Sequence, residues 1–242
     1  MIDLHSHILS GIDDGAKDIS ESIEIALQSV AVGVTHMMCT PHIHQGIFEN
    51  TTSTINSAFG ALVQAFISHN IPLKISKGSE VRLDTTILGG IANNQIPFIG
   101  HWQGKKALLL ELPHSHVPPG AENLIRWLLK NDIQPVIPHP ERNRDIMADY
   151  NKLLFLKRQG CIFQVTAGAF VSRFSQKSGE LAEQMLSEGL IAYVASDTHS
   201  VKRRPNDMRM ARESIASLAG EDTAEQLTYV TPKEITQHVE WH

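Results

Sequence analysis

The sequence has few of the residues that mark several common classes of protein. Its 242 residues include 2 Cys, 3 Trp and 3 Tyr. The two thiols, Cys39 and Cys161, each lie within an apolar run, which is typical of a buried structural cysteine, so we expect no disulfide. No apolar run reaches the roughly 18 residues of a membrane span, and Asp3 and His5 leave no room for an apolar leader. We therefore expect no membrane insertion and a cytoplasmic location.

Positive charge is also scarce. Lys and Arg number 21 against 26 Asp and Glu, which gives a formal charge of −5 and a pI near 6.2. Proteins that bind nucleic acid or anionic membranes usually present an excess of Lys and Arg, so we expect no nucleic-acid partner. Histidine, by contrast, is plentiful, with 13 residues.

Short β-branched segments alternate with segments of helical periodicity as far as about residue 220, which indicates repeated βα units. Seven strands are predicted, at Ile2–His5, Val34–Thr40, Leu73–Gly78, Ala107–Leu112, Pro135–Pro138, Ile162–Thr166 and Ile191–Ser196. One helix is predicted to begin at a capping box formed by Asp18 and Glu21. Further helices are predicted at Ser53–His69, Ala121–Lys130, Tyr150–Arg158, Gly179–Glu188 and Asn206–Leu218. The pattern predicts one α/β domain over residues 1–242, built as an irregular barrel, with a doubly wound open sheet as the alternative.

Potential metal ligands follow these strands. His5 and His7 end the first strand two residues apart, so their imidazoles point to the same side of an extended chain. Side chains of the same chemistry stand at the ends of later strands: His42, Glu80, Glu111, His139, Asp197 and His199. The strand ends of a parallel barrel share one face, and that face carries the active site in enzymes of this fold.

Each of these residues has a structural explanation by itself, such as an ion pair or a helix cap. Together they need compensating positive charge, and no matching set of Lys or Arg stands beside them. Metal ions supply such charge, and mixed imidazole and carboxylate ligands favour Mn, Fe or Zn over Ca or Mg. Asp14, preferred to Asp13, completes a set of nine side chains, which suffices for three ions if one carboxylate bridges two of them.

Four carboxylates and three divalent ions leave a site of about +2, which favours a phosphate dianion. Arg142, three residues after His139, can present its planar guanidinium to phosphate oxygens. These features predict phosphoester hydrolysis in a single step by a metal-bound hydroxide. Neither cysteine is followed by Arg at the spacing of a Cys-x5-Arg loop, so a thiolate mechanism is excluded. His114 and His116 are further candidates for loop contacts or proton transfer, although no motif supports them.

The motifs resemble the polymerase and histidinol phosphatase (PHP) superfamily and, within it, the CpsB-like manganese-dependent protein-tyrosine phosphatases of bacterial capsule and exopolysaccharide systems. The resemblance covers residues 1 to about 205 and is carried by Asp3-Leu4-His5-Ser6-His7, Gly11-Ile12-Asp13-Asp14-Gly15, Thr40-Pro41-His42, Gly78-Ser79-Glu80, His139-Pro140-Glu141-Arg142 and Ser196-Asp197-Thr198-His199. It implies a distorted seven-stranded (β/α) barrel, three divalent ions (manganese, with iron or zinc as alternatives), and a bacterial tyrosine kinase as the phosphotyrosine partner.

The resemblance also implies how the ligands divide. The first ion takes His5, His7, Glu80 and Asp197, the second shares Glu80 and adds Glu111 and His139, and the third takes Asp14, His42 and His199. Arg142 holds the phosphate, and Arg204 resembles a second phosphate-side arginine. One departure is that Ile43 follows His42 where these phosphatases often have a second His, and His44 comes one residue later.

Two other functions stay open. One is a histidinol-phosphate phosphatase, or another small-phosphoester hydrolase, on the same metal site. The other is a non-catalytic module that metal ions stabilise. Lys202, Arg203 and Arg204 beside His199 favour an acidic phosphopeptide over the cationic histidinol phosphate.

Overall fold

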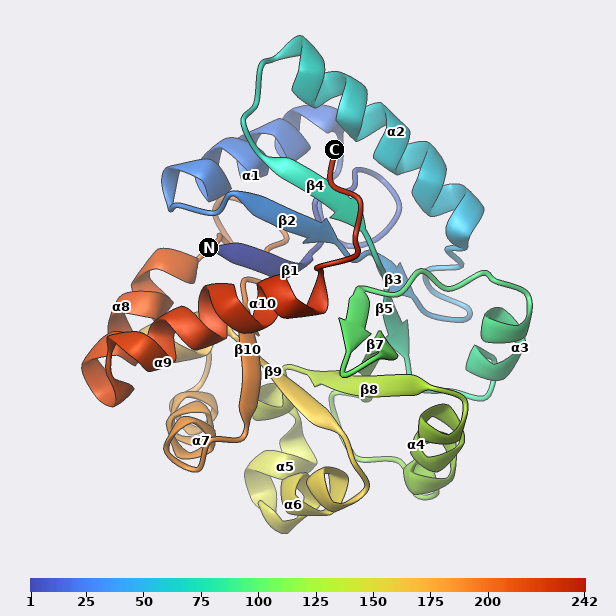
Figure 1. Ribbon diagram of the computed structural model, residues 1–242, viewed down its shortest axis with the longest axis vertical. Coiled ribbons are helices and arrows are strands. Elements are labelled where there is room, and N and C mark those ends of the chain that lie inside the picture. Colours follow the sequence, from blue (N-terminus) through green and yellow to red (C-terminus); the bar gives the residue numbers. More distant parts are fainter.

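The computed structural model describes residues 1–242, with parallel strands around a common centre and helices outside them (Figure 1). The strands are β1 (Ile2–Ser6), β2 (His36–Cys39), β3 (His42–Ile43), β4 (Lys74–Lys77), β5 (Glu80–Arg82), β6 (Gly100–Trp102), β7 (Lys105–Glu111), β8 (Ile133–Pro138), β9 (Ile162–Thr166) and β10 (Ile191–Ala195). The α-helices are α1 (Ile19–Ala31), α2 (Thr52–Ser68), α3 (Ile87–Ala92), α4 (Ala121–Lys130), α5 (Arg144–Ala148), α6 (Asn151–Arg158), α7 (Gln176–Ser187), α8 (Met208–Ala219), α9 (Glu221–Glu225) and α10 (Thr231–Ile235). Short 3-10 helices lie at Pro140–Arg142 and Ala167–Val171, and a π-helical turn at Gln226–Val230.

The strands form two sheets, ordered β1-β2-β4 and β10-β9-β8-β7-β5-β3, and β6 pairs antiparallel with β7. Strands β3 and β5 continue β2 and β4 after a short break that includes Pro41, which has no N–H to donate. Backbone hydrogen bonds from Gly78 to Cys39 (2.8 Å) and from Glu80 to Pro41 (3.1 Å) carry the pairing across that break.

At the other junction the two sheets meet where β1 and β10 end. The N–H of His7 donates to the carbonyl of Thr198, and the N–H of Asp197 donates to the carbonyl of His5, both at 2.9 Å. The seven predicted strands are thus confirmed as seven parallel positions around a centre. The fold is the predicted α/β arrangement of mostly parallel strands, divided between two sheets, and the hydrogen bonds that join the sheets favour the distorted (β/α) barrel over the open-sheet alternative.

Alternating side chains along the strands make an inner and an outer apolar layer. On β7, Ala107 and Leu109 belong to the inner layer, whereas Leu108 and Leu110 pack outward among the helices. The inner layer consists of Ile2, Leu4, Met38, Ile99, Ala107, Leu109, Val136, Tyr193, Ala195 and Ile235. The barrel interior is therefore a packed core, so any site has to lie at one of its ends.

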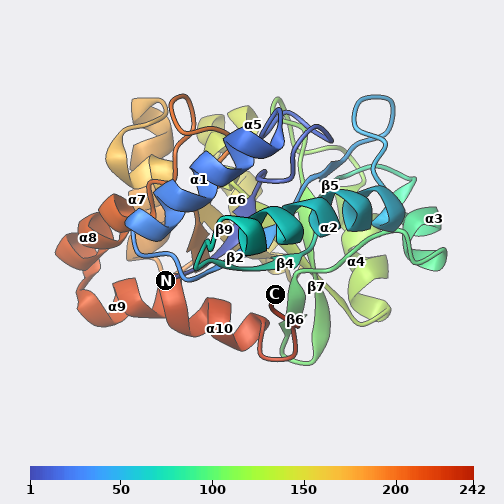
Figure 2. The same ribbon diagram turned by 90° about the horizontal axis from the view of Figure 1, so that it is seen from above.

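The residues after Gly220, for which the sequence predicted no structure, close one end of the barrel. Figure 2 shows α9 and α10 on one side of the strands, opposite the long loops that follow β1 and β3. Ile235 of α10 is 1% exposed and lies in the inner layer. Gly100 of β6 has a φ of +139°, and a Cβ there would lie 2.2 Å from the Ile235 carbonyl oxygen, so this close approach requires glycine.

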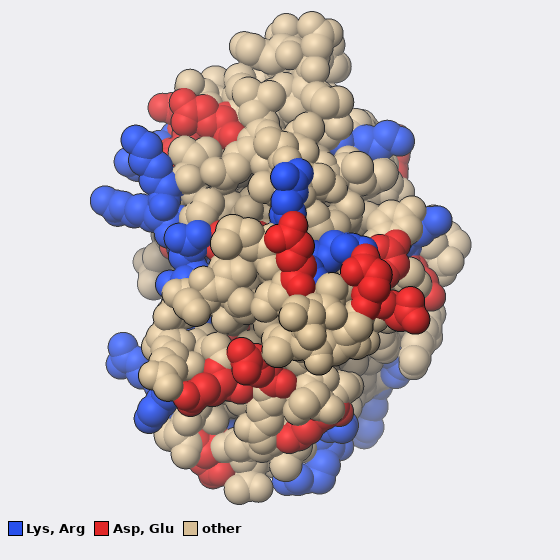
Figure 3. All heavy atoms as spheres, turned by 90° about the vertical axis from the view of Figure 1, so that its left-hand side faces the viewer, with Lys and Arg blue, Asp and Glu red and all other residues tan.

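The predicted helices are confirmed, with ends shifted by up to three residues. Asp18 caps α1 by accepting from the N–H of Glu21 at 2.9 Å, but the Glu21 carboxylate accepts from Lys17 rather than completing a capping box with Asp18. Helices α3 and α5 and strand β6 were not predicted. No helix has both the length and the apolar character needed to cross a bilayer. Acidic and basic side chains intermingle on the face that carries α8 and α9 (Figure 3).

Replacing Ile235 with Ala should lower the free energy of unfolding by about 2 to 5 kcal/mol, because it leaves a cavity in the inner layer. Leu218→Ala is the matched control: Leu218 is 53% exposed on α8, so a change within about 0.5 kcal/mol is expected. Denaturant unfolding at fixed metal concentration measures both. Equal free energies of unfolding for the two variants would contradict the conclusion that Ile235 of α10 closes the end of the barrel.

Candidate metal centre

A polar cluster lies at the end of the barrel opposite α10. There the inward-facing positions of the strands change from apolar to charged residues. Ala107 and Leu109 face inward on β7, so Glu111 is the next inward side chain. On β10, Tyr193 and Ala195 are followed in the same way by Asp197. Asp197 has a φ of +51° and His139 a φ of +36°, a left-handed backbone that non-glycine residues adopt mainly where function requires it.

All nine predicted ligand side chains meet in this cluster. The Nε2 atoms of His5 and His7 are 3.1 Å apart, and each lies 3.3 Å from Glu80 Oε2 and 3.4 Å from Asp197 Oδ1. Four donors of two chemical types therefore surround one small volume, which is the set that the resemblance implied for the first ion.

Glu80 lies between this group and the next. Its Oε1 is 2.7 Å from His139 Nε2, and its Oε2 is 3.1 Å from His42 Nδ1. Glu111 Oε2 approaches the same His42 nitrogen at 3.7 Å. The central place of Glu80 suits a bridging carboxylate, whereas His42 faces the Glu80 and Glu111 pair with one nitrogen, a contact the sequence did not predict.

The third group lies at the rim. Asp14 Oδ1 is 3.4 Å from the Nε2 atoms of both His42 and His199, and His7 completes the group. The Asp14 side chain is 51% exposed, whereas the Asp13 side chain is buried. The structure thus brings Asp14, rather than Asp13, into the cluster of candidate ligands.

Asp13 and Gln164 hold the imidazoles in place, and sequence reasoning missed both roles. Asp13 Oδ2 accepts from His7 Nδ1 at 2.7 Å, and Gln164 Oε1 lies 2.8 Å from His5 Nδ1. These bonds leave both Nε2 atoms directed at the centre, as partners of metal-binding histidines usually do. Asp13 also accepts from the N–H of Gly15, where a Cβ would lie 2.0 Å from the His7 carbonyl oxygen.

Three arginines border the cluster. Arg142 Nη1 donates to Asp197 Oδ2 at 2.6 Å, and Arg204 Nη2 donates to the same oxygen. The Arg142 guanidinium also stacks on Phe174, 4.7 Å from the ring centroid. Arg82 was not predicted: it lies 3.1 Å from Glu111 Oε2 and donates to the Leu112 carbonyl at 2.8 Å.

The two extra histidines differ in position. His114 lines the central cavity, and its Nε2 lies 3.8 Å from Glu111 Oε1. His116 hydrogen-bonds the neighbouring Ser115 hydroxyl at 2.8 Å and does not line that cavity. Among the two, His114 alone is placed to meet a ligand.

The buried donors fit divalent cations. Glu80 Oε2, both Glu111 oxygens and His42 Nδ1 are buried without a hydrogen-bond partner, which is costly unless an ion binds them. Burial, with the Glu80 carboxylate nearby, raises the pKa of Glu111 to about 9. Burial lowers the pKa of His42 to about 4 and that of His139 to about 3, so both rings are neutral at pH 7 and free to ligate.

A cluster of this kind at the strand ends of a (β/α) barrel defines a metal-dependent hydrolase. The chain belongs to the family described as capsular polysaccharide synthesis, CpsB/CapC, whose model matches residues 1–237.

Relatives and a solved structure agree with this family. The tyrosine-protein phosphatase YwqE of Bacillus subtilis (strain 168) is 35% identical over 204 residues, which cover 84% of this chain and 79% of that protein. The putative tyrosine-protein phosphatase CapC of Staphylococcus aureus is 31% identical, over an alignment that covers 85% of this chain and 79% of that protein. A crystal structure from work on YwqE of B. subtilis and CpsB of Streptococcus pneumoniae, described as unique metal-dependent tyrosine phosphatases, superimposes with a TM-score of 0.91 at 32% identity and covers 98% of this chain and 94% of that one.

Metal binding should release a proton from Glu111. Because its raised pKa keeps this carboxyl group protonated below about pH 9, an ion has to displace that proton, and metal affinity should rise as the pH approaches 9. Calorimetric titration of metal-free protein with manganese at pH 8, in two buffers of different ionisation enthalpy, counts the protons. Glu111→Gln should release about one proton fewer; an unchanged count would contradict the assignment.

Proposed function

We propose that this protein is a metal-dependent protein-tyrosine phosphatase, a single catalytic domain over residues 1–242. The observation that carries the proposal is the meeting of nine imidazole and carboxylate side chains, several of them buried without partners, with two arginines at one carboxylate. Membership of the CpsB/CapC family and the names of its relatives support phosphotyrosine as the substrate. The partner we propose is a bacterial tyrosine kinase of capsule or exopolysaccharide synthesis, dephosphorylated in the cytoplasm.

The proposed cofactors are three divalent ions, with manganese first and iron or zinc as alternatives. We propose the division that the resemblance implies, with His5, His7, Glu80 and Asp197 around one ion, Glu80, Glu111 and His139 around another, and Asp14, His42 and His199 around the third. The distances support the first and third sets. In the second set, Glu80 contacts His139 at 2.7 Å, whereas Glu111 lies nearer to His42 than to His139 and groups with His42 and Glu80. Bound ions of this kind lower the pKa of water and neutralise charge on the phosphoryl group. With four carboxylates the site carries about +2, which favours a phosphate dianion.

The arginines bind and orient the phosphate. Both guanidinium groups reach the same edge of the cluster at Asp197, and each offers further N–H donors to phosphate oxygens. Phe174 supports the plane of Arg142, and His199 Nε2 lies 2.8 Å from Arg204 Nη1. Charge that develops on the phosphoryl oxygens during hydrolysis would be stabilised by donors already in place.

The shape of the site favours a long, protruding phosphoester. The central cavity measures about 30 Å³ and shares lining residues with two larger grooves of about 450 and 580 Å³. A phosphotyrosine side chain reaches such a centre while its peptide stays outside, and its phenolate leaves with little acid assistance. Lys202 and Arg203 border one groove, where they attract an acidic peptide and repel a cationic amino alcohol, although Asp18, Glu21 and Glu24 line the same groove and offset part of this charge.

Glu80→Ala and Arg142→Ala should fail in different ways. Glu80→Ala removes a shared ligand, so we expect loss of bound metal and of activity together. Arg142→Ala should keep its metal and lose kcat/KM equivalent to about 2 to 4 kcal/mol of transition-state stabilisation, as for other charged oxyanion donors. Metal analysis beside kinetics separates the two, with the exposed Arg126→Ala as control. Loss of metal in Arg142→Ala would show that its role is wrong.

The substrate is tested by comparing manganese-loaded protein on phosphotyrosine peptides, phosphoserine peptides and histidinol phosphate. We expect the highest kcat/KM for phosphotyrosine peptides. Added salt should lower this kcat/KM, because it screens the attraction between an acidic peptide and Lys202 and Arg203. If histidinol phosphate is the better substrate by about tenfold, equivalent to about 1.4 kcal/mol, the small-phosphoester alternative replaces the tyrosine phosphatase.

A further inference from the structure

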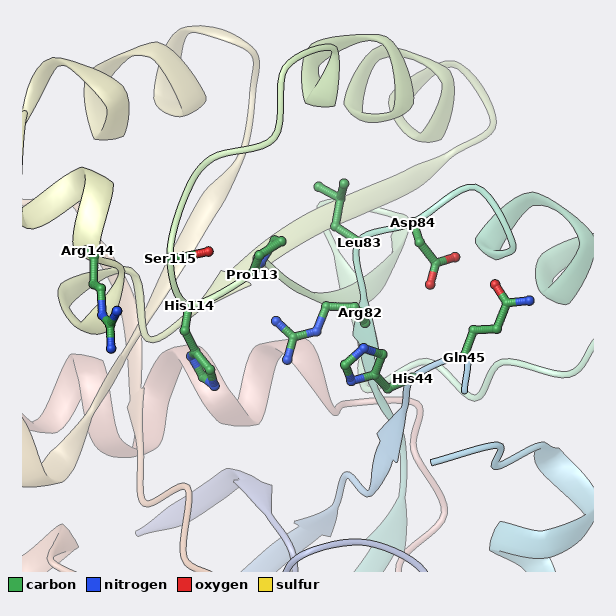
Figure 4. A pocket seen from close by; sticks show the side chains of 9 residues that line it. All are labelled: His44, Gln45, Arg82, Leu83, Asp84, Pro113, His114, Ser115 and Arg144. Atoms are coloured by element: carbon green, nitrogen blue, oxygen red, sulfur yellow. The ribbon is translucent and has the colours of Figure 1, made fainter. Parts of the chain in front are cut away.

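A second polar groove lies beside the metal centre. It measures about 450 Å³ and is formed where β3, β5 and β7 end and α5 begins. Four nitrogen-bearing side chains, His44, Arg82, His114 and Arg144, extend along the same side of it (Figure 4). We call it the Arg144 groove. A cavity with this lining suits an anion better than an apolar group.

The Arg144 groove and the metal centre share a wall. His114 lines both cavities. Glu111 Oε2 lies 3.1 Å from Arg82 Nη2 on the groove side and 3.7 Å from His42 Nδ1 on the metal side. One carboxylate oxygen thus separates the groove arginine from a proposed metal ligand, so a molecule whose phosphate sits at the centre also reaches the groove.

The end of the groove at Arg144 is cationic and unpaired. The Arg144 side chain is exposed and makes no ion pair, while its backbone N–H donates to the His114 carbonyl at 3.0 Å and fixes the residue beside the centre. Asp84, the acidic residue of the groove, lies at the opposite end and is occupied by the N–H of Thr86 at 2.7 Å and by its hydroxyl (Figure 4). Arg82 is held by Glu111 and by the Leu112 carbonyl. Arg144 is therefore the charge left for a ligand.

We propose that the Arg144 groove binds a second anionic group, a carboxylate or a phosphate, on the same peptide as the phosphotyrosine, within about two residues of it. Side chains two residues apart in an extended peptide lie on the same side and about 6.6 Å apart. Because the metal centre and the groove share a wall formed by His114 and Glu111, a residue at that spacing can approach the groove while the phosphotyrosine occupies the centre. Arg144 then determines specificity for acidic sequences. This inference rests on the proposed phosphatase function and adds the sequence that the site selects.

The test measures kcat/KM of the manganese-loaded protein on matched phosphotyrosine peptides. The residue one or two places before or after the phosphotyrosine is Gln, Glu or the phosphonodifluoromethyl analogue of phosphotyrosine, which is not hydrolysed. We expect about a fivefold preference for an anionic neighbour, the size of one solvent-accessible charge pair. A preference for the phosphonate alone identifies a second phosphotyrosine as the natural ligand, and a preference for both identifies any acidic residue; either supports the groove.

Variants locate the source of the preference. Arg144→Gln should abolish the ratio between anionic and neutral peptides, Arg144→Lys should restore part of it, and Arg144→Glu should invert it. Arg126→Gln, an exposed arginine on α4 outside the groove, should keep the wild-type ratio. Equal rates on anionic and neutral peptides, or an unchanged ratio in Arg144→Gln, overturn the inference and leave the phosphatase assignment intact. Turnover of histidinol phosphate with none of any phosphotyrosine peptide overturns both.

Discussion

Four carboxylates and five imidazoles at one end of the barrel require positive charge that the protein supplies only in part. Arg142 and Arg204 pair with Asp197, and Arg82 pairs with Glu111, but Glu80 Oε2 has no hydrogen bond and no Lys or Arg beside it, and the pKa of Glu111 is raised by burial. Such a cluster is unfavourable unless cations fill it. The same imbalance accounts for the buried donors without hydrogen bonds and for the two arginines that contact Asp197.

The barrel accommodates this charge imbalance because its two ends differ: one is closed by apolar residues and the other carries the polar cluster. The inner layer is apolar from Ile2 to Ala195, and Ile235 closes it at the end away from the metal centre. Packing of that kind fixes the strand ends, so the polar side chains that follow them on different strands are held at defined separations. Four candidate ligands lie in the strands themselves, namely His5, His42, Glu80 and Glu111. The other five follow the strand ends, where a left-handed backbone at His139 and Asp197 sets the directions of these two side chains.

The sequence predicted the strands and the inward residues at their ends, because both follow from an alternation with a period of two. It did not predict Gln164, Asp13 as the partner of His7, or Arg82. Gln164 and Arg82 contact residues on other strands, and Asp13 reaches His7 only through the conformation of the loop after β1. The role of α10 was equally hidden: Ile235 is one apolar residue in a polar segment, and its importance arises from the barrel end it fills. The local pattern thus identifies candidate ligands, whereas the residues that support them depend on the three-dimensional arrangement of strands and loops.

Asp197 contacts both the proposed metal ligands and the two arginines proposed to bind phosphate. Its Oδ1 faces the Nε2 atoms of His5 and His7 at 3.4 Å, while its Oδ2 accepts from Arg142 and Arg204. One carboxylate therefore presents one oxygen to the proposed ion and the other to the proposed phosphate-binding groups. If the residues hold a cation as proposed, positive charge beside Asp197 would withdraw negative charge from Oδ2, weaken its hold on both guanidinium groups and leave their donors available to a phosphate. Metal loading and phosphate binding would then be coupled through a single side chain.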